Sequence, residues 1–201
     1  MFERFSLNAR MAVVQAQAQA RELKHPWIGP EHLLIGIVTQ ENAPHALTRR
    51  GITVETCRKA LITTVGGGAG LSDEDAAELL KNGFPVPGHP LAPPEPKRGL
   101  FGRRKPEPAP GLLTLEQALA QHIPFTVSGH RALRTSAEVP VEQEGDMIAL
   151  PHLTYAVADP GNAVIDRMFG FLGTDTVTVR TEVLAELKEL LAVWPDLTKK
   201  D

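Results

Sequence analysis

Two parts of the chain repeat each other at a fixed spacing, and this constrains the fold more than any single motif. Four residues of the first part recur 120 positions later (125 − 5 = 120): Phe5, Ala12, Ile28 and His32 match Phe125, Ala132, Ile148 and His152. Gly51 matches Gly173 at a spacing of 122 (173 − 51), so two residues are added before it. A duplicated unit adopts one fold twice, and a unit this small has a marginal core of its own. The two units are therefore expected to pack together.

The first unit has the pattern of four short helices. Apolar residues recur at helical spacing over residues 8–24, and Pro30 suits the first turn of a second helix because its missing N–H would be unpaired there anyway. A third helix is expected over about residues 43–50, and Thr53 is a suitable N-cap for a fourth. We therefore predict an all-α fold of two four-helix repeats related by a pseudo-twofold axis. The repeats span residues 1–65 and residues 112–201, the second with a preceding short helix.

Residues 66–111, between the repeats, are expected to form a long proline-rich insert. Ser72 and Asp75 have the spacing of a capping box, which predicts a short helix over about residues 72–82. Nine of the chain's 17 prolines lie between positions 85 and 110. That density excludes helix and sheet and favours an extended, partly disordered tether.

Three local features modify this plan. The segment KRGLFGRRK, residues 97–105, holds five basic side chains and favours a solvated linker over a contact with nucleic acid, an acidic partner or an anionic lipid surface. TLEQALAQ, residues 114–121, predicts a short helix before repeat 2. Pro140 occupies the position of Ala20 in repeat 1 and predicts a shortened or kinked helix.

The composition is that of an ordinary soluble protein, with 42% hydrophobic and 22% charged residues. A formal net charge of −3 gives no global reason to expect nucleic acid or a membrane as a partner. Cys57 is the only cysteine, so no intramolecular disulfide can form, and we expect it to be a small core residue. The start lacks a signal-peptide pattern and no stretch reaches about 20 apolar residues. We therefore expect a cytoplasmic protein.

The motifs argue against an enzyme. After the glycines of residues 66–70 a phosphate-binding loop would need a lysine and a hydroxyl residue, but Leu71 and Ser72 follow. The seven histidines form neither HExxH nor a Cys/His pair at metal-ligand spacing, so no metal or cofactor is expected. Glu31 and His32 are adjacent on a helix and point about 100° apart, which prevents direct cooperation in acid–base chemistry.

The polar pair at the start of the second helix has a structural explanation and a functional one. His32 and His152 are expected to bond backbone groups in the first turn of their helices. The helix dipole stabilises the carboxylate of Glu31 in the first turn by about 0.3–1 kcal/mol. It could also offer itself to a guanidinium group beside the helix-terminal amides. The sequence leaves both roles of Glu31 open.

Several features together resemble one family. MFERF at the start, IGPEHLLIGIV at residues 28–38, HIPFT at residues 122–126 and the duplication are similar to the N-terminal domain of Clp unfoldases, most closely the ClpC type of actinobacteria. The resemblance is strong over residues 1–65 and weak over residues 122–192. It implies a helical pseudo-dimer that receives substrates and adaptors, while separate ATPase modules unfold them. No Walker motif occurs here, so it implies a free-standing, non-catalytic binding protein.

The resemblance implies an apolar ligand groove between the repeats, where such domains of actinobacteria bind cyclic peptide antibiotics. The matching positions are Met1, Phe2, Val13, Val14, Gln17, His122, Pro124 and Phe125. His130 and Arg134 replace a lysine and a glutamate of the family pattern. The alternative is that these residues only hold the two repeats together.

The resemblance also implies a phosphoarginine contact at Glu31. Pro30 replaces the neighbouring threonine of the family, and in repeat 2 Leu150 and Pro151 replace threonine and glutamate, so the second contact is expected to be lost. We therefore expect a protein that captures peptide-like ligands, either cyclic peptide antibiotics or tagged protein segments. The alternative is a regulator that docks on a ClpC-type ATPase or its adaptors through residues 97–105.

Overall fold

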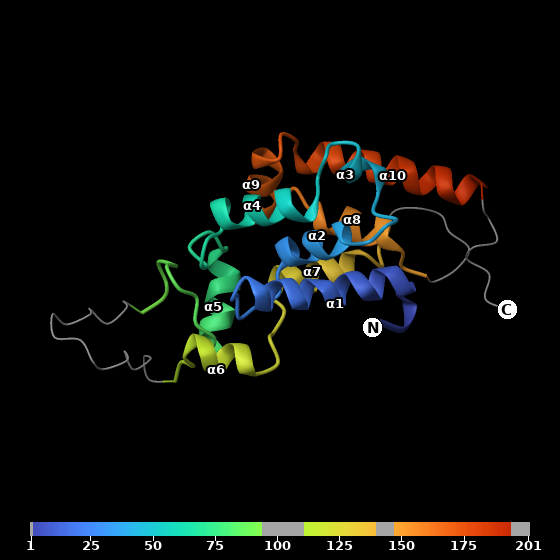
Figure 1. Cartoon of the computed structure of the whole chain (residues 1–201). Helices are drawn as coiled ribbons and strands as arrows, with labels where there is room; N and C mark the ends of the chain where they lie inside the picture. The colour runs from blue at the N-terminus through green and yellow to red at the C-terminus, as the bar shows by residue number, and fades with distance from the viewer. Residues whose placement is uncertain (1, 94–110, 140–146, 194–201) are drawn as a thin grey trace.

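The computed structural model describes residues 2–93, 111–139 and 147–193, and the fold of these residues is all-α, as predicted (Figure 1). Repeat 1 contains a 3-10 turn, η1 (Phe2–Arg4), and four helices, α1 (Leu7–Glu22), α2 (Pro30–Val38), α3 (His45–Thr48) and α4 (Val54–Thr64). Two short helices follow, α5 (Asp73–Lys81) and α6 (Leu115–Ala120). Repeat 2 contains α7 (Val127–Thr135), α8 (Leu150–Val157), α9 (Ala163–Phe171) and α10 (Thr176–Val193).

The helices begin where the sequence supplies caps. The Ser6 side chain accepts from the backbone N–H of Ala9 at the start of α1, and Thr126, 120 positions later, accepts from Gly129 at the start of α7. Thr53 caps α4 as predicted. Side-chain oxygens at these positions satisfy N–H groups that have no partner within the helix. The repeat in the sequence is therefore also a repeat in how each unit starts.

Two crossed β-bridges join the repeats. Phe5 of repeat 1 pairs with Ile148 of repeat 2, and Phe125 of repeat 2 pairs with Ile28 of repeat 1. The backbone N–H of Ile148 donates to the carbonyl of Arg4 (2.7 Å), and that of Ile28 donates to the carbonyl of Pro124 (2.8 Å). The counterparts of Phe5 and Ile148 thus contact each other in the second bridge, as at an isologous twofold interface. The pseudo-twofold arrangement is confirmed.

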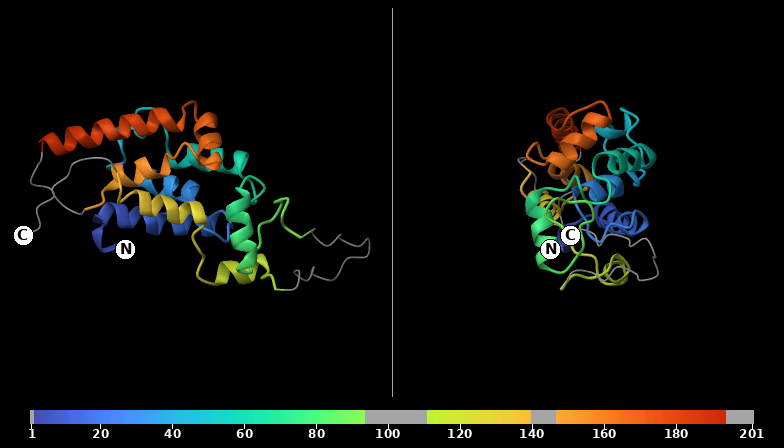
Figure 2. Two further views of the ribbon diagram at one scale, coloured as in Figure 1. Left: turned by 180° about the vertical axis from the view of Figure 1, so that it is seen from behind. Right: turned by 90° about the vertical axis from the view of Figure 1, so that its left-hand side faces the viewer.

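The same exchange orders the helices into layers. α2 and α8 lie in the middle of the molecule, with α1 and α7 on one side (Figures 1 and 2). On the other side α3 packs against α10, and α4 packs against α9, so each outer pair combines one helix from each repeat. All but one residue of α2 are buried. The core therefore runs continuously through both repeats.

A glycine sets the distance between the first two helices. A β-carbon added to Gly36 of α2 would overlap the backbone carbonyl of Ala12 in α1. The two helices therefore approach closely only because position 36 has no side chain. The loop glycines Gly51 and Gly173 both adopt positive φ, 66° and 77°, which a glycine tolerates without strain and which explains their place in the repeat.

Repeat 2 departs from repeat 1 in its first helix. α7 has nine residues, whereas α1 has 16. The shortening agrees with the sequence prediction, but Pro140, to which it was attributed, lies outside the described residues. α10 has 18 residues and is longer than its counterpart α4, which has 11. Among the described residues no helix is long and apolar enough to cross a membrane.

The insert is only partly as predicted. Ser72 caps α5 by accepting from the backbone N–H of Asp75, as a capping box requires. The Asp75 carboxylate, however, accepts from Ser128 of α7 and not from the backbone N–H of Ser72, so the predicted return bond of the capping box is wrong. Val86 and His89 are buried against the body although they lie in the proline-rich stretch. The rest of that stretch and the basic segment 97–105 lie outside the described residues.

Candidate functional site

The start of α2 contains a buried polar cluster, which we call the α2 cluster: His25, Trp27, Glu31 and His32. Glu31 and His32 are fully buried, and the indole N–H of Trp27 donates to Glu31 Oε1 (3.0 Å). The backbone N–H of Gly29 donates to His32 Nδ1 (3.1 Å), while His32 Nε2 lies 3.0 Å from His25 Nδ1. His25 also stacks on Trp27, with ring centroids 4.7 Å apart. The cluster thus fastens the end of α1 to the start of α2.

His32 and His152 have the structural role that the sequence predicted. The backbone N–H of Ala149 donates to His152 Nδ1 (3.2 Å), as that of Gly29 does to His32. Burial, and after it the neighbouring His32, lowers the pKa of His25 to about 4. Burial likewise lowers the pKa of His152 to about 4. The rings of His25 and His152 are therefore neutral at pH 7.

Glu31 is enclosed by the protein and is not presented to a ligand. Its Oε2 atom has no hydrogen-bond partner among the described residues. Burial raises the pKa of Glu31, but the neighbouring His32 outweighs this effect, so the net direction is downward. A guanidinium could reach this carboxylate only after Trp27 or the turn at Gly29 had moved. The structure therefore favours the structural role of Glu31 over the contact that the resemblance implied.

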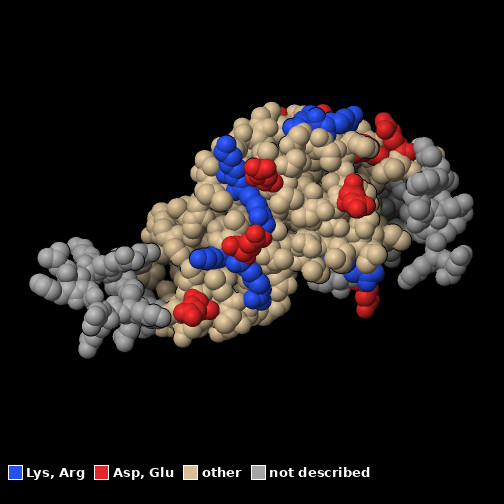
Figure 3. All heavy atoms as spheres, in the orientation of Figure 1, with Lys and Arg blue, Asp and Glu red and all other residues tan. Residues whose placement is uncertain are grey.

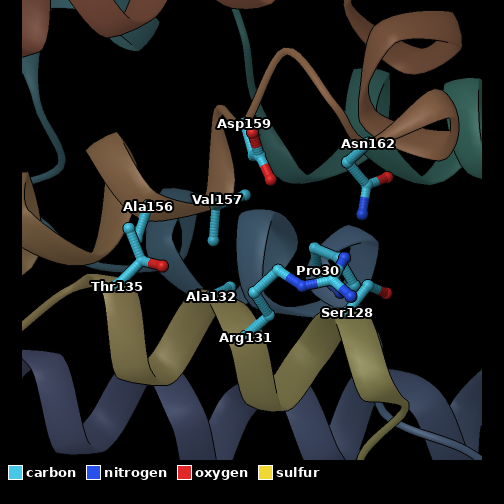
Figure 4. A pocket seen from close by; sticks show the side chains of 9 residues that line it. All are labelled: Pro30, Ser128, Arg131, Ala132, Thr135, Ala156, Val157, Asp159 and Asn162. Carbon is cyan, nitrogen blue, oxygen red and sulfur yellow. The ribbon is translucent and has the colours of Figure 1, made fainter.

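A hollow on the surface lies beside the first turn of α2, and we call it the α7 hollow (Figure 4). It is lined by Pro30, Ser128, Arg131, Ala132, Thr135, Ala156, Val157, Asp159 and Asn162. Arg131 rises from α7, while Asp159 and Asn162 approach from the loop between α8 and α9. The lining combines small apolar side chains with one cation, one anion and several hydrogen-bonding groups. This arrangement suits a ligand that bears both charges.

The polar groups of the hollow are already engaged. The Arg131 guanidinium donates to both carboxylate oxygens of Glu74 in α5, at 3.2 and 2.9 Å. Asp159 accepts from the backbone N–H of Gly161 (3.1 Å) and lies 3.6 Å from Arg180. The side-chain carbonyl of Asn162 caps α9. The side-chain amide nitrogen of the same residue points into the hollow in Figure 4.

The predicted groove residues lie in two groups. On α1, Val13 and Gln17 are half-buried, and Val14 is 55% exposed. Val13 packs against the common core, as does Phe125. Met1 and the side chain of Phe2 lie outside the described part. The α1 group therefore offers a partly apolar surface.

The second group lies before and along the start of α7. Pro124 and Phe125 are half-buried, His122 and His130 are exposed, and Arg134 is exposed further along α7. The structure brings Phe125 and His130 together, with ring centroids 5.5 Å apart. The hollow found in the structure is lined by a different set of residues.

Sequence reasoning missed most of the lining of the hollow, including its polar residues Arg131, Asp159 and Asn162. Arg131 corresponds to Met11 in repeat 1, so the repeat pattern gave no signal for it. The clearest available signal was the run of three acids that opens α5, because such a run needs a partner or solvent.

The surface shown in Figure 3 has no extended region of one charge. Basic and acidic side chains are intermixed there. Such a face lacks the one-sign field that attracts nucleic acid. Within the described ranges, no group of three or more His, Cys, Asp or Glu residues is placed to hold a metal ion.

Two four-helix repeats joined by crossed bridges define a Clp-type N-terminal domain fold. The structure is similar to the N-terminal domain of the chaperone ClpD from Arabidopsis thaliana, with a TM-score of 0.59 and 18% identity over 94% of this chain and 97% of that one. It is also similar to the N-terminal domain of Hsp104 from Candida albicans, with a TM-score of 0.55 and 13% identity over 92% of each chain. These likenesses establish the fold.

The sequence comparisons agree. The family model described as the Clp repeat (R) N-terminal domain matches residues 4–81. The chain is 25% identical to the chloroplastic chaperone ClpC2 of Oryza sativa subsp. japonica over 191 residues, which cover 94% of this chain and 16% of that protein. It is 38% identical to chloroplastic ClpD2 of the same plant over 66 residues, 33% of this chain and 7% of that protein.

The chain is therefore similar to the Clp repeat (R) N-terminal domain over residues 4–81 and to ClpC chaperones along nearly its whole length. It spans about a sixth of the length of the ClpC relatives that it matches. The two sequence relatives named above are plant proteins, so the actinobacterial subtype stays a prediction.

Proposed function

We propose that this chain is a non-catalytic receiver of peptide-like ligands. The observation that carries the proposal is the position of Phe125 within a Clp-type fold. The residue lies on one of the two bridges that join the repeats, half-buried, with its ring beside His130. A partly exposed aromatic ring on a rigid junction is a suitable anchor for an apolar peptide, because it loses little conformational entropy on binding.

The outer face of α1 is a second apolar surface of the domain. Leu7, Met11 and Val14 follow one another at helical spacing and are 68, 40 and 55% exposed. Exposed apolar side chains that recur on one helix face are typical of interaction surfaces. We therefore propose an apolar peptide, including cyclic peptide antibiotics, as the ligand of α1 and Phe125.

Protein segments phosphorylated on arginine are the second ligand that we propose, with the α7 hollow as their site. Arg131 and the amide of Asn162 would hold the phosphoryl group, and Asp159 would face the guanidinium. Support comes from the two opposite charges on the rim and from the closeness of Pro30, which opens α2. Glu31 is too deeply enclosed to serve as the guanidinium partner in this conformation.

Calorimetric titration with a cyclic peptide of the class that binds ClpC-type domains tests the first part of the proposal. Binding is expected to weaken about tenfold or more in Phe125→Ala, because aromatic anchors carry much of the energy of such contacts. Phe171→Ala is the matched control, since Phe171 is also partly exposed, at 43%, but lies at the end of α9. Equal affinities in the wild type and Phe125→Ala would reject Phe125 as the anchor.

A further inference from the structure

Helix α5, which belongs to neither repeat, contacts residues that line the α7 hollow. The first turn of α5 contains three carboxylates, Asp73, Glu74 and Asp75. Two of them reach residues that line the hollow: Glu74 contacts Arg131, and Asp75 contacts Ser128. The acidic turn of α5 therefore faces the first turns of α7, where backbone N–H groups and a guanidinium favour negative charge.

The contact of Asp75 is a fixed anchor. The residue is 1% exposed, and its two carboxylate oxygens accept from the backbone N–H of Ser128 (2.9 Å) and from the Ser128 hydroxyl (2.6 Å). Removing one partner from a buried, charge-assisted pair leaves an unsatisfied group and is strongly unfavourable. Asp75 is therefore expected to keep α5 in place whether or not the hollow is occupied.

The contact of Glu74 is exchangeable. The side chains of Arg131 and Glu74 are 52 and 57% exposed, and exposed ion pairs contribute little to stability because solvent competes for both groups. The hydrogen bond that Arg131 donates to Glu74 is the main reason that the pKa of Arg131 is raised. Glu74 thus satisfies the one cation among the residues that line the hollow, without being locked there.

We propose that Glu74 is an intramolecular competitor that pairs with Arg131, the cation of the α7 hollow, in place of the anionic group of a ligand. A phosphoryl or carboxylate group of a ligand displaces Glu74 from Arg131, while Asp75 and Ser128 stay paired. Asp159 faces the same space and repels a simple anion, so the ligand must also bring a positive group. This inference rests on the hollow being the polar ligand site of the proposed function and adds its regulation by the insert.

Phosphoarginine as the free amino acid is the probe, with binding followed by chemical shifts of the backbone amides of α7. Glu74→Gln is expected to bind it about 2- to 5-fold more tightly than the wild type, the range that loss of an exposed ion pair allows. Glu78→Gln is the matched control, because Glu78 lies on the same helix but pairs with Lys81 and Asn82. Arg131→Gln is expected to lose binding.

An affinity of Glu74→Gln equal to or weaker than that of the wild type would overturn the proposal. An equal gain in Glu78→Gln would do the same, because it would indicate a general effect of charge. Arginine without the phosphoryl group serves as the second probe, and its affinity is expected not to rise in Glu74→Gln. The peptide titration of Phe125→Ala is independent of these experiments, so either proposal can fail alone. Thermal unfolding of each variant confirms that it is folded.

Discussion

The carboxylate of Glu31 occupies the space that a side chain on Gly29 would need. A β-carbon added to Gly29 would stand 2.6 Å from the carboxyl carbon of Glu31, well inside van der Waals contact. Repeat 2 has the opposite choice at both positions, with Ala149 matching Gly29 and Pro151 matching Glu31. The two changes belong together, because a β-carbon fits at the first position only when the carboxylate is absent from the second.

Gly29→Ala is therefore expected to destabilise the protein by about 1–3 kcal/mol, the usual cost of overpacking a tight site. In a Glu31→Ala background the same change is expected to cost at least about 1 kcal/mol less, because the obstructing group has gone. Urea unfolding of the four proteins of this cycle measures the coupling.

Gly170→Ala is the matched control for that cycle. Gly170 lies in α9, and an added β-carbon would meet nothing within 4 Å. Because alanine is the better helix former, a gain of about 0.5–1 kcal/mol is expected. A zero coupling between positions 29 and 31 would contradict the steric explanation.

Lys24 follows the end of α1 and has a left-handed backbone conformation, which favours glycine. Its φ is 59°, and the backbone N–H groups of Lys24 and His25 donate to the carbonyls of Arg21 and Ala20, which is a Schellman motif. Lys24→Gly is expected to raise the free energy of unfolding by about 0.5–1 kcal/mol, since a left-handed lysine is strained. Lys24→Ala should give no such gain. Thermal unfolding of both variants measures the difference.

Acid is expected to destabilise the fold through its buried histidines. The pKa values of His25 and His152 are about 4 in the folded protein, below their ordinary value of 6.5. Between these values the unfolded chain binds protons that the folded chain does not. The free energy of unfolding should therefore fall by about 1.4 kcal/mol per pH unit for each histidine as the pH drops from 6.5 towards 4. Above pH 6.5 the two rings contribute no slope.

Urea unfolding at several pH values measures this slope. His152→Gln keeps a side chain that can accept from the backbone N–H of Ala149, and it should remove about half of the dependence. His122→Gln, at an exposed position, should leave the slope unchanged. A wild-type stability that is constant between pH 7 and 5 would show that the two rings titrate normally in the folded state.

The thiol of Cys57 is expected to be unreactive in the folded protein. Cys57 is fully buried in α4, and burial raises its pKa to about 12, so the nucleophilic thiolate is scarce at neutral pH. An aromatic disulfide reagent should label no thiol in the native protein and one in urea. Rapid labelling without denaturant would indicate that α4 opens readily.

The arrangement of helices could be predicted from the sequence because its signals are local. Thr53 at the N-cap of α4, Pro30 in the first turn of α2 and the loop glycines each act within a few residues of their position. The repeat spacing then indicated which residues are equivalent. It could not indicate that Phe5 pairs with Ile148 rather than with a residue of its own half, because spacing identifies counterparts and not contacts.

The candidate site was less predictable because it depends on contacts between distant residues. Asp75 has the spacing of a capping partner for Ser72, but Ser128 offers its carboxylate two donors at a buried position. The burial of Glu31 depends on Trp27 and on the missing side chain of Gly29. None of these relations has a characteristic spacing in the sequence.

The crossed bridges have a consequence for how the chain can vary. Because Phe5 pairs with Ile148 and Phe125 pairs with Ile28, the two bridges fix the relative placement of the halves independently of the chain that connects Val65 to Ile123. That connection can lengthen at little entropic cost, since loop closure grows only slowly with length. New elements such as α5 and α6 can therefore be accommodated at this one point of the chain without disturbing the architecture around them.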